Sequence, residues 1–147
     1  MTRFGLIAIL AVVTFASSCG LPLSISASHV DANVPDPADF DRILIHDLTE
    51  YVTDSDDKGI SVKYEMLRDR PSQSGVALPK FYCWLQKLDA DGNVIEEAAI
   101  RMAAVDKTHF DVIQYFEKDR IIREPEVLKG VFPADVIEKI MAKVQPK

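Results

Sequence analysis

The chain of 147 residues lacks the sequence patterns on which most recognisable chemistry depends. It contains no GxSxG motif of a serine hydrolase and no GxGxxG or GxxxxGK loop that would bind phosphate. Its two cysteines and three histidines form no CxxC or HxxxH pair, so we predict no metal site and no cofactor. The sequence therefore favours a protein without catalytic residues.

Clusters of positive charge are also missing. The formal net charge is −6, whereas binding to phosphate backbones requires grouped Lys and Arg side chains. This composition excludes nucleic acid as an expected partner. Hydrophobic residues make up 48% of the chain and charged residues 27%, which is typical of one ordinary globular domain.

Long hydrophobic runs are absent as well. The longest apolar run, from Phe4 to Phe15, follows the positive charge of Arg3. About a dozen residues are too few to cross a hydrocarbon core of about 30 Å as a helix. Because small residues follow the run, we predict that residues 1–18 are a signal peptide and that the protein is exported.

The segment Ala-Ser-Ser-Cys-Gly at positions 16–20 resembles the lipobox of bacterial lipoprotein precursors. That resemblance implies cleavage by signal peptidase II before Cys19, lipid attachment at Cys19, and tethering to a membrane facing the periplasm. Gly20 after the cysteine implies the outer membrane if the cell has one. Ala16 stands where such boxes usually have Leu, so ordinary cleavage after Ser18 or Ser28, giving a periplasmic or secreted protein, is the alternative.

Residues 19–35 are rich in Ser, Ala and Pro without a sustained period, so we expect a flexible tether. Residues 36–147 then form a single domain. If Cys19 carries lipid, Cys83 is left unpaired, and its place among aromatic residues indicates a small buried hydrophobic side chain. A Cys19–Cys83 disulfide in an oxidising compartment is the alternative.

Hydrophobic periodicity predicts a helix over residues 37–53, with Asp36 as its cap and Pro37 at its first position. Strands are predicted over residues 60–66, 80–88, 94–105 and 108–116, and helical pieces over 118–129 and after Pro133. Many residues of 94–105 favour helices. The turn at Asp91-Gly92-Asn93 nevertheless makes a strand the better prediction for 94–105.

This order of elements predicts an α+β fold in which the N-terminal helix packs on a curved four-stranded antiparallel sheet, followed by C-terminal helices. By element order alone, it resembles the cystatin-like and NTF2-like folds. In those folds a curved sheet often leaves a concave pocket, which different members use for catalysis, for ligands or for dimer contacts. The fold alone does not indicate which of these uses applies.

A pocket on such a sheet would draw on a few polar and aromatic side chains. His109, Asp111 and Tyr115 are expected on one face of strand 108–116, with Arg101 to hold an anion and Trp84 as a neighbouring aromatic. The same face is equally compatible with contact to solvent.

Two ligands do not make a metal site, so His109 and Asp111 are insufficient for one by themselves. His46 and its neighbour Asp47 would join them only if the first helix packs at that place. The leading hypothesis is an envelope lipoprotein that binds a protein partner or stabilises an assembly. The alternative is a small-molecule-binding or catalytic domain that uses the concave sheet face.

Overall fold

The computed structural model of the chain describes residues 32–54, 57–74 and 77–145. The predicted signal peptide, Cys19 and most of the predicted tether lie outside these residues. Val34 already packs against the hydrophobic core, and Pro35 is buried.

Four antiparallel strands form one open sheet in the order β1-β2-β3-β4, as predicted. The strands are β1 (Ser61–Met66), β2 (Lys80–Leu88), β3 (Val94–Asp106) and β4 (His109–Glu117). The segment whose residues favour helices is therefore the long strand β3. Its pairing with β2, from Lys80 opposite Ala103 to Leu88 opposite Val94, outweighs the helical preference of its alanines and glutamates.

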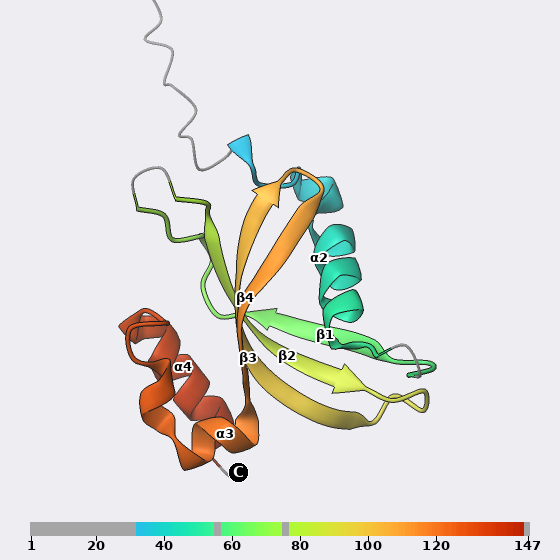
Figure 1. Cartoon of the computed structure of the whole chain (residues 1–147), viewed down its shortest axis with the longest axis vertical. Helices are drawn as coiled ribbons and strands as arrows, with labels where there is room; N and C mark the ends of the chain where they lie inside the picture. Colours follow the sequence, from blue (N-terminus) through green and yellow to red (C-terminus); the bar gives the residue numbers. More distant parts are fainter. Residues whose placement is uncertain (1–31, 55–56, 75–76, 146–147) are drawn as a thin grey trace, which may run out of the picture.

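One face of the sheet is covered by α2 (Pro37–Val52), in agreement with the predicted helix (Figure 1). The apolar residues of α2 recur at helical spacing and pack on the inward-facing residues of the strands. Asp36 occupies the N-cap position but makes no side-chain capping bond; its carboxylate lies 3.4 Å from Lys107 instead. The core on this side consists of Ile43, Leu44, Leu48, Val62, Phe81, Cys83, Leu85, Ala98, Ile100, Met102, Ala104 and Phe110.

The opposite face is covered by the C-terminal elements α3 (Lys118–Arg123), η1 (Pro125–Leu128) and α4 (Ala134–Val144) (Figure 1). The predicted helical segment 118–129 is divided before Pro125 into α3 and η1. The core on this side consists of Leu67, Tyr82, Trp84, Ala99, Phe116, Ile121, Leu128, Phe132, Val136, Ile140 and Val144. Because helices cover both faces of the sheet, consecutive residues of β2 are buried on either face.

Strand β4 departs from the predicted alternation. Gln114 pairs with Arg101, but the next pair is Val112 with Met102, so Ile113 is an extra residue in the ladder. A bulge of this kind exchanges the two faces of a strand beyond it. Tyr115 therefore packs with Val112 on the α2 side, and Phe116 joins the C-terminal core. The regular alternation that was predicted to place His109, Asp111 and Tyr115 on one face is therefore broken between Asp111 and Tyr115.

Among the residues described, every helix is too short or too polar to traverse a lipid bilayer.

Candidate functional site

The structure divides the predicted pocket residues between the two sides of the sheet. Trp84 belongs to the core under the C-terminal helices, and Arg101 lies on the same face because it follows Ala99 at strand spacing. Tyr115 packs on the α2 side, where His109 contacts α2. Of the five residues, His109 and Asp111 are joined directly, with His109 Nε2 2.8 Å from Asp111 Oδ1.

A large open cleft of about 1210 Å³ lies between the C-terminal helices and the edge of the sheet formed by β1 and β2. Trp84, Ile122, Ala142 and Val144 supply its apolar lining. Its remaining lining residues are Lys63, Tyr64, Glu65, Gln86, Glu97, Lys118, Lys139, Lys143 and Gln145. Apolar and charged side chains are thus mixed on both the strand side and the helix side of the cleft.

Glu97 on β3 is the polar centre of this cleft. Its Oε1 accepts a hydrogen bond from the indole N–H of Trp84 at 3.2 Å and another from the amide of Gln86 at 3.1 Å. Its Oε2 accepts a bond from the ammonium group of Lys118. Burial raises the pKa of the Glu97 carboxyl, but these three donors together lower it by more than burial raises it. Its net pKa therefore lies below the usual value of 4.5.

The cleft carries excess positive charge in an acidic protein, because four lysines line it against two glutamates. Lys118 pairs with Glu97, and Lys143 pairs with Glu65. Lys139 donates to the carbonyl oxygen of Leu67, an uncharged acceptor. Lys63 is exposed and makes no ion pair within the described part of the chain. Two cationic groups therefore remain available to an acidic ligand.

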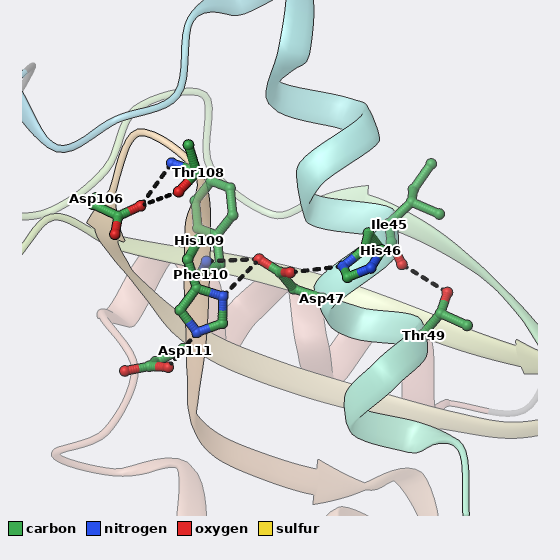
Figure 2. A network of polar contacts seen from close by, with 9 residues as sticks. All are labelled: Ile45, His46, Asp47, Thr49, Asp106, Thr108, His109, Phe110 and Asp111. Carbon is green, nitrogen blue, oxygen red and sulfur yellow. Dashed lines mark hydrogen bonds and ion pairs between the residues drawn. The ribbon is translucent and has the colours of Figure 1, made fainter.

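A second polar cluster joins α2 to β4 (Figure 2). Asp47 Oδ1 lies 3.0 Å from His46 Nδ1, and Asp47 Oδ2 lies 3.3 Å from His109 Nδ1. The backbone N–H of Phe110 donates to Asp47 Oδ2 at 2.7 Å. The first helix therefore packs beside β4, where Asp47 contacts both His46 and His109, and His109 in turn contacts Asp111.

Both ring nitrogens of His109 face carboxylates, an arrangement that suits the doubly protonated ring. Partial burial lowers the pKa of His109. The hydrogen bond to Asp111 and the negative charges of Asp47, Asp111 and Asp106 outweigh that effect and raise the net pKa above 6.5.

Sequence reasoning did not identify the roles of Asp47, Glu97 and Lys118. A signal for Asp47 exists, since it lies four residues after Ile43 and three after Leu44, within the apolar stripe of the helix. A carboxylate at that place requires a buried partner. The link of Glu97 to Lys118 depends on how the C-terminal helices return to the sheet, so no local pattern marks it.

Comparison of the chain with known protein families, with curated proteins and with solved structures found no match.

Proposed function

We propose that this protein is an exported, lipid-tethered protein of the cell envelope whose domain binds an acidic segment of a protein partner without catalysing a reaction. The N-terminal run and the lipobox-like segment ending at Cys19 support export and tethering. The observation that carries the binding role is the cationic cleft beside β1, in a chain whose net charge is −6.

The dimensions of the cleft favour a polypeptide over a small molecule. Pockets for drug-sized ligands usually enclose about 300–1,000 Å³, whereas this cleft is larger and open along the edge of the sheet. Its mixture of apolar side chains and lysines matches a segment that combines acidic and apolar side chains. The two unneutralised cations, Lys63 and Lys139, would contact its carboxylates.

The other sheet face offers less support for a ligand pocket. Phe40 of α2 packs on Phe81 with ring centroids 5.4 Å apart and on Phe110 with centroids 5.2 Å apart. Phe81 and Phe110 are themselves 5.6 Å apart. This aromatic cluster fills the space between α2 and the strands.

The tether is tested by expressing the full precursor in a bacterial host and measuring the intact mass of the mature protein in each cell fraction. A membrane-bound species that starts at Cys19 and carries acyl chains is the expected result. A soluble species that starts after residue 19 would overturn the lipoprotein proposal.

The cleft is tested by photo-crosslinking in the organism that makes the protein. A photoreactive amino acid replaces Ile122, which lines the cleft, and in a matched control it replaces Ile45 on α2; these side chains belong to residues 54% and 42% exposed. We expect a crosslink from position 122 alone, mapped by mass spectrometry to an acidic segment.

The dependence on charge is tested with Lys63→Glu, which reverses a charge in the cleft, and with Lys129→Glu, which makes the same change at an exposed site outside it. Lys63→Glu should abolish the crosslink and Lys129→Glu should preserve it. Equal crosslinking by both variants, or from positions 45 and 122 alike, would contradict the proposal.

A further inference from the structure

About one turn of α2 places three potential metal ligands together. A ring nitrogen of His46 and one carboxylate oxygen each from Asp47 and Glu50 all lie within 4.8 Å of one another. His46 and Glu50 are four residues apart, so they project from the same side of the helix. Asp47 is adjacent to His46 and turns toward the sheet.

The carboxylate of Asp47 is held in place before any ion arrives. Its side chain is 7% exposed, and its Oδ2 is fixed by the N–H of Phe110 and by His109. Its Oδ1 is left directed at His46, as Figure 2 shows. Hydrogen bonds of this type, made to the far side of a ligand, orient the ligands of natural metal sites and strengthen them.

The other two groups are accessible to solvent. The side chain of His46 is 72% exposed, and Glu50 is exposed and forms no salt bridge within the described residues. An ion could therefore reach the three donors from solvent. The group offers one imidazole nitrogen and two carboxylates, which would balance a charge of +2.

We propose that His46, Asp47 and Glu50 form a binding site for a divalent transition metal of the zinc class. Zinc accepts imidazole and carboxylate ligands at about 2.0–2.2 Å in tetrahedral geometry, which places donor atoms roughly 3.3 Å apart. The donor atoms, which lie within 4.8 Å of one another, must therefore approach by up to about 1.5 Å, and the exposed side chains of His46 and Glu50 can rotate to do so. Calcium is disfavoured because it takes about six to eight oxygen ligands. Three protein ligands leave one coordination position for water or for a group from another molecule.

This site is independent of the cleft, which lies on the opposite side of the sheet. It is tested by titrating ZnCl₂ into the purified protein, made without a polyhistidine tag and freed of metal, in a calorimeter. We expect saturable binding of one ion per chain. Co²⁺ in place of Zn²⁺ should give the visible absorption of a tetrahedral site.

Two ligand variants and two matched controls assign the residues. His46→Ala and Glu50→Gln should each weaken zinc binding by at least about tenfold. His29→Ala, the same change in the N-terminal segment, and Glu124→Gln, the same change at another exposed acid, should leave it unaltered. Circular dichroism of all four variants checks that the fold is intact.

Absence of saturable zinc binding by the unmodified protein would overturn the proposal. Equal affinity in His46→Ala, Glu50→Gln and the unmodified protein would do so too. Loss of binding in His29→Ala would assign the ion to the N-terminal segment and overturn the site on α2.

Discussion

The carboxylate of Asp47 on α2 accepts the backbone N–H of Phe110 on β4 at 2.7 Å, across 63 positions of the chain. Asp47 is the one buried charged residue among those the structure describes. The bond satisfies a backbone donor near the start of β4, on a strand at the edge of the sheet. The hydrogen bond to Asp47 therefore links α2 to β4.

Replacing Asp47 tests how much that connection contributes to stability. Asp47→Ala leaves the Phe110 N–H without its acceptor and separates His109 from its buried partner. We expect the free energy of unfolding in urea to fall by about 1–3 kcal/mol. Asp111→Ala, which removes an exposed carboxylate that also contacts His109, is the control and should change it by less than about 0.5 kcal/mol. Equal losses of unfolding free energy in the two variants would show that the buried hydrogen bond stabilises the fold no more than the exposed contact does.

Glu97 should make stability depend on pH in the acid range. Its folded pKa lies below 4.5, so its ionised form stabilises the fold at pH values above 4.5, and that contribution fades as the pH falls below it. Glu97→Gln should therefore cost about 1 kcal/mol near neutral pH, and the difference from the unmodified protein should shrink in acid. Urea unfolding measured across the acid range checks this.

The control for Glu97 is Glu65→Gln. Glu65 also pairs with a lysine of the cleft, but its side chain is 65% exposed, so solvent screens the pair. Glu65→Gln should therefore change the free energy of unfolding little, both near neutral pH and in acid. A Glu97→Gln deficit that stays constant from neutral to acid pH would contradict the assignment.

Much of the fold could be predicted from the sequence because its signals are local. Alternation of Val62, Tyr64 and Met66 with polar residues defines β1, and the turn around Gly92 defines the β2–β3 hairpin. That turn forms as expected, with Asp89 Oδ1 accepting the N–H groups of Asp91 and Asn93. These features depend on residues within a few positions of one another.

The candidate sites could not be predicted in the same way because they depend on long-range geometry. The bulge at Ile113 moves Tyr115 to the α2 side, and no local pattern marks it. The cleft arises where α3 and α4 return to the sheet, which brings Lys118 to Glu97 and Lys143 to Glu65. Of the features of the candidate sites, only the position of Asp47 within the apolar stripe of the helix can be read from the sequence.

Two glycines with similar backbone conformations should respond differently to substitution. Gly59 and Gly92 have φ of +77° and +82°, where a side chain costs about 1–2 kcal/mol. A Cβ at Gly59 would also lie 2.8 Å from Cβ of Ala90, whereas one at Gly92 would meet nothing within 4 Å. Gly59→Ala should therefore lower the melting temperature more than Gly92→Ala does.

The contact with Ala90 can be isolated by a double substitution. Ala90→Gly removes the methyl group that a side chain at position 59 would meet, so it should recover part of the loss caused by Gly59→Ala. It should recover nothing in the Gly92→Ala background. Additive effects in both backgrounds would show that the close approach of the two loops is unimportant.

Cys83 should resist alkylation in the folded protein. Its side chain is fully buried in the core under α2, and burial raises the pKa of its thiol, so the reactive thiolate is both scarce and inaccessible. Iodoacetamide should leave Cys83 unmodified in buffer and modify it completely in denaturant, as peptide mass spectrometry would record. Modification of Cys83 in buffer at the rate of a free peptide would contradict its place in the core.

The same alkylation experiment also distinguishes the three possible chemical states of Cys19, which are lipidated, free and disulfide-bonded. If lipid is attached at Cys19, denatured mature protein should take up a single alkyl group, and a Cys83→Ala variant should take up none. If Cys19 is a free thiol, the Cys83→Ala variant should still be modified once, without denaturant. If the two cysteines form a disulfide, denaturant alone would expose no thiol, and a reductant would be needed before either residue reacts.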